Sequence, residues 1–182
     1  EMKSYMYGLA ISQFLWSTHY KMYSFFISNI KKNIKKTNSY LEIGSGHGLF
    51  LLKALENLGK NTKFDIVDIS STSIKITKSV IKFFFKNKRD INYHTKNIFS
   101  YKSKYKYDFI SLGEVLEHVN NPNKLLNKIK FLLNKEGKVY LSTCIDCPSI
   151  DHIYHFKSIG QVEQIIKKSG FKILKRNILP VE

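Results

Sequence analysis

The sequence contains few cysteines and few arginines, and both shortages narrow the kinds of protein it can encode. Cys144 and Cys147 are the two cysteines in 182 residues, too few for a framework of disulfides. The net charge is +16, yet Arg89 and Arg176 are the two arginines among 30 basic residues. Phosphate recognition favours the planar guanidinium, and the lysines are scattered along the chain. We therefore interpret the charge as a solvated lysine surface and do not expect nucleic acid as a partner.

Long apolar runs are also missing. The most apolar stretch, residues 5–27, is rich in aromatic side chains but is interrupted by Ser12, Gln13, His19 and Lys21. A membrane-spanning helix needs about 20 mostly apolar residues, so we expect no membrane span. The opening residues do not resemble a signal peptide, and the chain has no internal repeat or low-complexity tract. A cytoplasmic protein is the expectation.

Hydrophobic residues make up 43% of the chain, enough for the core of one domain. Residues 4–35 carry apolar side chains at helical spacing and predict one long N-terminal helix. Beyond them strands and helices alternate, which predicts an α/β fold with a doubly wound, mostly parallel, Rossmann-like sheet and helices on both faces. The predicted strands are 40–43, 63–67, 91–94, 107–112, 137–142 and 171–176, and the predicted helices are 49–58, 73–85, 122–133 and 158–168. Ligands of such sheets bind beyond the carboxyl ends of the strands.

A glycine-rich turn follows the first predicted strand. Gly44, Gly46 and Gly48 stand where the chain leaves that strand and enters a helix. Glycine there permits a tight turn and lets backbone N–H groups approach a ligand. Asp68 ends the next strand, twenty residues after Gly48, which is the spacing expected for an acid that binds ribose hydroxyls. Asp65 is the rival acid, but it falls inside that strand.

Five segments together resemble class I S-adenosylmethionine-dependent methyltransferases. Leu-Glu-Ile-Gly-Ser-Gly-His-Gly-Leu-Phe at 41–50 resembles the first motif of that family, and Val-Asp-Ile-Ser at 67–70 resembles the second. Residues 107–119 resemble the fourth motif, in the subgroup that includes ubiquinone O-methyltransferases. Residues 132–142 and 169–173 resemble the segments of the fifth and sixth strands. The motifs occur in the family's order over nearly the whole chain.

The resemblance implies S-adenosylmethionine as the cofactor and S-adenosylhomocysteine as its product. A nicotinamide-dependent oxidoreductase is disfavoured, because Leu49 stands where its glycine pattern needs a third glycine. The resemblance also implies a helical lid at 1–37 and a cofactor-binding domain at 38–182. The family's seventh strand is expected to be missing here, either because the protein lacks it or because the chain is truncated. Asn97 stands where the family usually has an aspartate for adenine. The implied cofactor-binding residues are Glu42, Gly44, Ser45, Gly46, Gly48, Asp68, Ile69, Asn97, Ile98, Gly113 and Glu114.

Polar residues after the fourth and fifth predicted strands are candidates for the acceptor side. Histidine has an ordinary pKa of about 6.5 and suits a general base near neutral pH. We expect His152 in that role before His155, with Asp151 fixing a tautomer and His118 as a further candidate; a structural role for each is the alternative. Two cysteines stand nearby, but a structural zinc finger needs a longer spacer, so we expect no metal site.

These observations predict an S-adenosylmethionine-dependent methyltransferase whose acceptor is a hydroxyl or amine of a small-molecule metabolite. An RNA or protein methyltransferase is the enzyme alternative. A catalytically silent cofactor-binding subunit is the non-enzyme alternative, although the complete glycine turn and Asp68 argue against it. The acceptor and the oligomeric state stay open.

Overall fold

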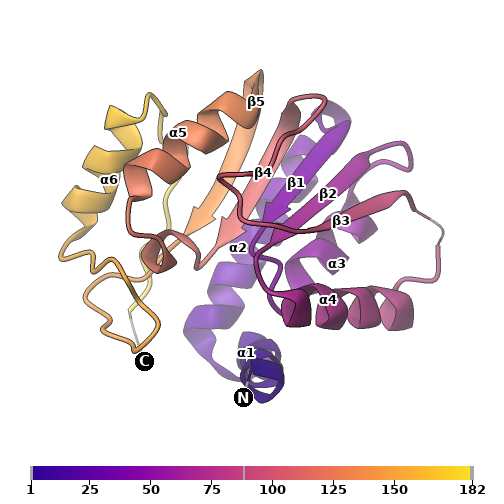
Figure 1. Cartoon of the computed structure of the whole chain (residues 1–182), viewed down its shortest axis with the longest axis horizontal. Helices are drawn as coiled ribbons and strands as arrows, with labels where there is room; N and C mark the ends of the chain where they lie inside the picture. The colour runs from indigo at the N-terminus through magenta and orange to yellow at the C-terminus, as the bar shows by residue number, and fades with distance from the viewer. Residues whose placement is uncertain (1, 88, 181–182) are drawn as a thin grey trace.

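The computed structural model describes residues 2–87 and 89–180, which form one sheet between two layers of helices (Figure 1). The N-terminal part is helical, and strands and helices alternate after it. The elements in chain order are α1 (Met2–Leu15), α2 (Ser17–Asn33), the 3-10 helix η1 (Ile34–Lys36), β1 (Ser39–Ile43), α3 (Leu49–Asn57), β2 (Lys63–Asp68), α4 (Ser71–Phe84), β3 (Ile91–Thr95), β4 (Tyr107–Gly113), the 3-10 helix η2 (Leu116–His118), α5 (Pro122–Leu132), β5 (Leu133–Ser142) and α6 (Ile159–Lys168).

The sheet has the strand order β3-β2-β1-β4-β5, and each neighbouring pair is parallel. This confirms the predicted fold class. The chain first builds outward from β1 to β3 and then returns to the other side of β1 with β4. The order therefore reverses between β1 and β4, and a ligand crevice is expected beyond their carboxyl ends.

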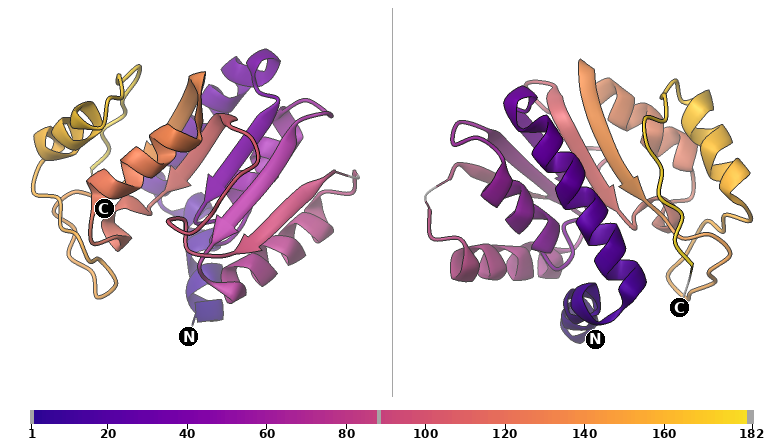
Figure 2. Two further views of the ribbon diagram at one scale, coloured as in Figure 1. Left: turned by 45° about the horizontal axis from the view of Figure 1, so that its top comes forward. Right: turned by 180° about the vertical axis from the view of Figure 1, so that it is seen from behind.

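Alternate residues of the central strands point into two separate cores. Tyr40 packs with α2, α3 and α4 on one face, whereas its neighbour Leu41 packs with α5 and α6 on the other. Figure 2 shows the two helical layers from opposite sides. Because both faces are covered, β1 is buried along its whole length. The rigid sheet fixes the positions of the loops that leave its carboxyl edge.

The prediction of one continuous helix over residues 4–35 is wrong in one respect. The helix is broken at Trp16, whose φ and ψ of −96° and 126° are extended, so α1 and α2 are separate. Ser17 and Thr18 follow the break, and short hydroxyl residues favour helix starts over helix interiors. The two helices remain joined at the break, because the His19 Nδ1 lies 2.7 Å from the Ser12 hydroxyl oxygen.

The strand predicted for residues 171–176 is also wrong. This segment runs past the outer edge of β5 (Figure 2), but it forms no ladder with any described residue. Backbone that lacks a hydrogen-bonded neighbour does not form a strand, whatever its apolar pattern. Strand β5 itself begins earlier than predicted, at Leu133, with a register irregularity against β4. Within 2–87 and 89–180, no helix combines the length and the hydropathy needed to cross a bilayer.

Candidate active site

The glycine turn between β1 and α3 adopts left-handed backbone at three positions. The φ angles are +72° at Gly44, +49° at Gly46 and +79° at Gly48, values that other residues rarely adopt. A Cβ on Gly44 would lie 2.6 Å from a Val115 methyl carbon, and one on Gly48 would lie 3.0 Å from the Thr77 Cα. The turn is therefore wedged between the start of η2 and helix α4, and its shape is fixed.

Asp68 ends β2 and fastens this turn. Its Oδ2 accepts hydrogen bonds from the Gly46 N–H at 3.3 Å and from the Ser45 hydroxyl at 3.4 Å, while its Oδ1 accepts from the Ser70 N–H at 2.8 Å. Ser45 also accepts a hydrogen bond from the Thr77 hydroxyl at 3.0 Å. Burial raises the pKa of the Asp68 carboxyl. The sheet edge thus presents one carboxylate in a fixed orientation beside the turn.

The rival acid, Asp65, belongs to a buried structural network. Its carboxylate accepts hydrogen bonds from the Tyr105 hydroxyl and, at 2.9 Å, from the Tyr107 hydroxyl. The His94 Nε2 lies 2.9 Å from its other oxygen. Because both oxygens of Asp65 already have these partners, Asp65 supports the fold, and Asp68 is the acid of β2 that faces the glycine turn.

Glu42 lies within β1 and is 3% exposed. The Tyr40 hydroxyl donates a hydrogen bond to its Oε2 at 2.6 Å. Burial raises the pKa of Glu42 to about 8, so the carboxyl is mostly protonated at pH 7. Glu42 can therefore serve a ligand as a neutral hydrogen-bonding group rather than as a charge.

Three further cofactor candidates follow β2 and β3. Ile69 comes directly after Asp68 and is 72% exposed, so an apolar side chain stands free at the edge. The Asn97 Oδ1 accepts a hydrogen bond from the Phe99 N–H at 2.9 Å and keeps a second lone pair. Ile98 is buried in the core beside α5, which leaves only its backbone to meet a ligand.

The end of β4 carries a strained residue. Glu114 follows Gly113 with a φ of +51°, and its N–H donates to the carbonyl and the hydroxyl oxygens of Ser142 at 3.1 and 3.2 Å. Burial and then the charge of Glu117 raise the pKa of Glu114 to about 7. Such strain persists where surrounding contacts impose it, and it is common at functional sites.

Glu117 was not among the site residues chosen from the sequence. It is 1% exposed, and its Oε2 accepts a hydrogen bond from the Thr143 hydroxyl at 2.9 Å. Its Oε1 is buried without a hydrogen-bond partner among the described residues. Its carbonyl oxygen accepts from the N–H groups of Ile153 and Tyr154, which brings the loop after β5 onto η2. The available signal was its position directly before His118.

His118 and His152 come together at this edge, with ring centroids 5.0 Å apart. The His118 Nδ1 lies 2.8 Å from the Asp151 carbonyl oxygen, and the His152 Nδ1 lies 2.7 Å from the Cys147 carbonyl oxygen. A carbonyl oxygen only accepts, so Nδ1 carries the proton in both rings. In the neutral form each ring therefore keeps its basic lone pair on Nε2.

The other two acceptor-side candidates lie differently from the expectation. The Asp151 carboxylate pairs with His118 and not with His152, with 3.9 Å between the Asp151 Oδ2 and the His118 Nδ1. The same carboxylate accepts from the Ser149 hydroxyl at 2.6 Å, a bond that lowers the Asp151 pKa, and from the Tyr5 hydroxyl at 3.5 Å. His155 is exposed, and its Nε2 lies 3.2 Å from the backbone oxygen of His152.

Potential metal ligands gather around Glu117. One donor atom from each of Glu117, His118 and His152 lies within 4.8 Å of the others, and the same holds for Glu114, Glu117 and Cys144. Carboxylate, imidazole and thiolate groups are the usual protein ligands of divalent transition metals. A metal-bound histidine also commonly donates its other N–H to a backbone carbonyl. These side chains can therefore hold a divalent cation.

Helix α1 lies across the carboxyl edge, where the sequence predicted a lid (Figure 1). The Met6 sulfur lies 3.6 Å from the position a Cβ would take on Gly46. From α2, the Tyr23 hydroxyl donates to the Leu49 carbonyl oxygen at 3.2 Å. Helix α1 therefore lies against the glycine turn through Met6, and helix α2 binds the start of α3 through Tyr23.

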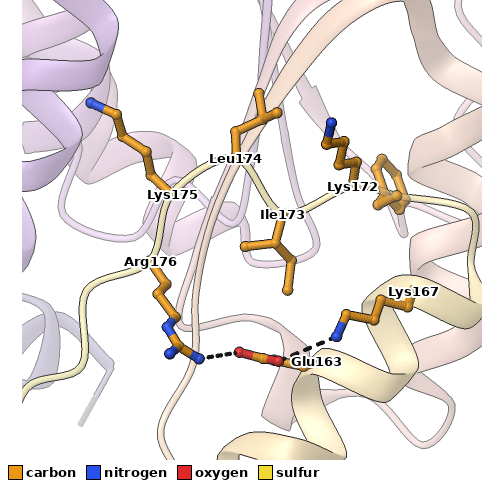
Figure 3. A pocket seen from close by; sticks show the side chains of 8 residues that line it. Glu163, Lys167, Lys172, Ile173, Leu174, Lys175 and Arg176 are labelled. Atoms are coloured by element: carbon orange, nitrogen blue, oxygen red, sulfur yellow. Dashed lines mark hydrogen bonds and ion pairs between the residues drawn. The ribbon is translucent and has the colours of Figure 1, made fainter.

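A separate open groove of about 580 Å³ lies beside α6 and the segment after it (Figure 3). Glu163 pairs there with Arg176 at 2.7 Å and with Lys167 at 3.5 Å. None of its lining residues belongs to the carboxyl edge of the sheet. We therefore assign the site to the edge and not to this groove.

A family model described as a methyltransferase domain matches residues 18–176. The chain belongs to this methyltransferase-domain family. The match confirms the resemblance on which the motif analysis rested. The matched range includes the glycine turn, Asp68 and the segment 107–119.

Two curated relatives are named after different acceptors. The chain is 34% identical over 112 residues to the ubiquinone biosynthesis O-methyltransferase of Pelagibacter ubique, a match that covers 62% of this chain and 42% of the relative. It is 28% identical over 109 residues to malonyl-[acyl-carrier protein] O-methyltransferase 1 of Ilyobacter polytropus, covering 60% and 39%. The matched part is thus less than half the length of either relative.

Solved structures share the fold at low identity. The carbon methyltransferase CurJ has a TM-score of 0.74 at 17% identity, covering 93% of this chain and 53% of that one. The N-methyltransferase NodS of Bradyrhizobium japonicum, solved with S-adenosylhomocysteine, has a TM-score of 0.59 at 15% identity, covering 69% and 61%. Carbon, nitrogen and oxygen acceptors all occur in these names, so the fold does not select the acceptor.

Proposed function

We propose that this chain is an S-adenosylmethionine-dependent methyltransferase domain that methylates a hydroxyl or amine of a small molecule. One observation carries the proposal: the glycine turn with Asp68 and the cluster of Glu117, His118 and His152 lie at the same carboxyl edge. The first group suits a nucleoside cofactor. The second presents basic nitrogens on the acceptor side. Together they support both halves of a methyl-transfer site.

The residues present fit S-adenosylmethionine, which would supply an already activated methyl group. A Cβ on Gly46 would meet no atom closer than 3.6 Å, so this part of the turn is open to close approach. The Asp68 carboxylate would accept hydrogen bonds from ribose hydroxyls, and exposed Ile69 would cover the base.

On the acceptor side, His152 is the proposed base. Its Nδ1–H is held by the Cys147 carbonyl, so its Nε2 can take the proton that a hydroxyl acceptor loses. An amine acceptor needs only to arrive neutral. Because the methyl donor is already activated, the remaining work is alignment of the acceptor and exclusion of water, which the lid helices support.

A second role for the same cluster follows from its donor geometry. Glu117, His118 and His152 would then hold a divalent cation that binds the acceptor oxygen and lowers its pKa. The unpartnered Oε1 of Glu117 favours this role, since a buried carboxylate oxygen without a partner is costly. A metal-dependent activity would separate this role from simple base catalysis.

A methyltransferase that acts on RNA or on protein is the alternative enzyme. The charge of +16 is the feature that favours RNA, whereas the near absence of arginine speaks against it. RNA binding that survives physiological salt would move the proposal from a small molecule to RNA. Transfer of labelled methyl to a protein would do the same for a protein acceptor.

The function is tested with labelled S-adenosylmethionine and a panel of phenols, alcohols and amines. The wild type should methylate at least one class. His152→Asn should lower turnover by about 10²–10⁴-fold while S-adenosylhomocysteine affinity stays unchanged. His155→Asn is the matched control, because His155 lies in the same loop but is exposed. Equal turnover in all three proteins would remove His152 from the mechanism.

A further inference from the structure

Helix α1 is positioned over the glycine turn by contacts near both of its ends. Near its start, the Met6 sulfur lies 3.6 Å from the Cβ position of Gly46. Near its end, the Phe14 ring packs 6.4 Å from that of Tyr23, which hydrogen-bonds the Leu49 carbonyl. The face of α1 that carries Met6 is therefore turned toward the glycine turn.

Gln13 lies on that face. It stands seven residues after Met6, which is two helical turns, so both side chains project from the same side of α1. Gln13 is 3% exposed. Its Nε2 makes one long hydrogen bond of 3.4 Å, to the Leu9 carbonyl oxygen, and its Oε1 is buried without any partner in the described part of the chain.

This arrangement is unfavourable for the protein alone. A buried amide oxygen that lacks a donor has lost its hydration without compensation. An apolar side chain of similar size would fill the same space between the helix and the turn at no such cost. The polar group is explained if a ligand supplies the missing donor when it binds beneath α1.

The chemical groups of the proposed cofactor indicate which donor could bind the Gln13 Oε1. Its ribose would lie at Asp68, and its methyl group must face the acceptor cluster of Glu117, His118 and His152. The amino-acid end is the part that remains for the glycine turn and the lid. Its ammonium carries N–H donors, and the Gln13 Oε1 is a buried acceptor on the lid that lacks a donor among the described residues.

We propose that the Gln13 side-chain amide, buried on the Met6 face of α1 with its oxygen unpartnered, binds the amino-acid end of S-adenosylmethionine by accepting a hydrogen bond from its ammonium group. The inference rests on the proposed function. It makes α1 part of the cofactor site and not only its cover. Because Oε1 is enclosed, α1 or the Gln13 side chain must shift as the cofactor enters, and the new hydrogen bond then favours the bound arrangement.

Calorimetric titration with two ligands tests this. S-adenosylhomocysteine carries the amino-acid end, whereas 5′-methylthioadenosine keeps the nucleoside and sulfur and lacks that end. Gln13→Leu should raise the Kd for S-adenosylhomocysteine by about tenfold or more, the scale of a hydrogen bond to a charged group, and change the Kd for 5′-methylthioadenosine less than about twofold. Gln13→Glu keeps an oxygen acceptor and should retain S-adenosylhomocysteine binding.

Gln161→Leu is the matched control. The Gln161 amide has a partner at each of its polar atoms, because it accepts from the Lys157 N–H and donates to the Tyr154 hydroxyl, so both affinities should match the wild type. Equal weakening of both ligands by Gln13→Leu would show that Gln13 only supports lid packing, and no weakening of either would also overturn the proposal. Wild-type protein that binds neither ligand would instead overturn the proposed function itself.

Discussion

Replacing Gly44 by alanine tests whether the glycine turn is as tightly wedged as the structure shows. Alanine at a φ of +72° loses about 1–2 kcal/mol to left-handed backbone strain. Its Cβ would also lie 2.6 Å from a Val115 methyl carbon, an overpacking that adds about 1–3 kcal/mol. Gly44→Ala should therefore lower the free energy of unfolding by about 2–5 kcal/mol, measured by urea denaturation without ligand.

Two further variants separate strain from overpacking. Gly46→Ala has a positive φ but no neighbour closer than 3.6 Å, so it should lose only the backbone part, about 1–2 kcal/mol. In a Val115→Ala background the obstructing methyl is gone, and Gly44→Ala should then also lose only about 1–2 kcal/mol. The reasoning would be refuted if Gly44→Ala lowered the free energy of unfolding by the same amount as Gly46→Ala. It would also be refuted if the loss caused by Gly44→Ala were the same with Val115 and with Val115→Ala.

Three other predictions concern charged and metal-binding groups. Asp68→Ala should weaken S-adenosylhomocysteine binding by about 1–3 kcal/mol in calorimetry, whereas Asp65→Ala should mainly lower stability; the reverse result would mean that Asp65 is the ligand acid. The pKa of Glu42 is raised from 4.5 to about 8 in the folded protein, so wild-type stability should fall as pH rises through that window. Glu42→Gln should lose less stability over the same range in thermal melts, and parallel pH profiles would contradict this. Mn²⁺ should raise the Tm of the wild type and of His155→Ala but not of Glu117→Gln, and equal shifts in all three would exclude the cation role.

Much of the fold could be predicted from sequence because its signals are local. The alternation of strands and helices predicts a parallel sheet, and sequence neighbours form each strand–turn–helix unit. The glycine turn and Asp68 follow from the same local pattern. Two errors arose for different reasons. The break at Trp16 depends on hydroxyl residues within an apolar pattern, and residues 171–176 have strand-like composition but no strand to pair with.

The acceptor side was harder to predict for a related reason. Glu117 joins the site because its carbonyl and carboxylate bind residues of the loop after β5, about thirty positions further along the chain. Spacing alone could not show that His152 would meet His118 or that His155 would lie exposed. The residues that could be chosen from sequence are those whose partners are near in sequence, such as Gly46 and Asp68.

The most direct test of the cofactor site is calorimetric titration of the wild-type chain with S-adenosylhomocysteine and, separately, with NAD. S-adenosylhomocysteine should bind at one site per chain and raise the Tm as its concentration increases, because it binds the folded state. NAD should produce no heat of binding and no shift in Tm. Binding of NAD together with no response to S-adenosylhomocysteine would contradict the assignment of the glycine turn and Asp68 to a methyltransferase cofactor site.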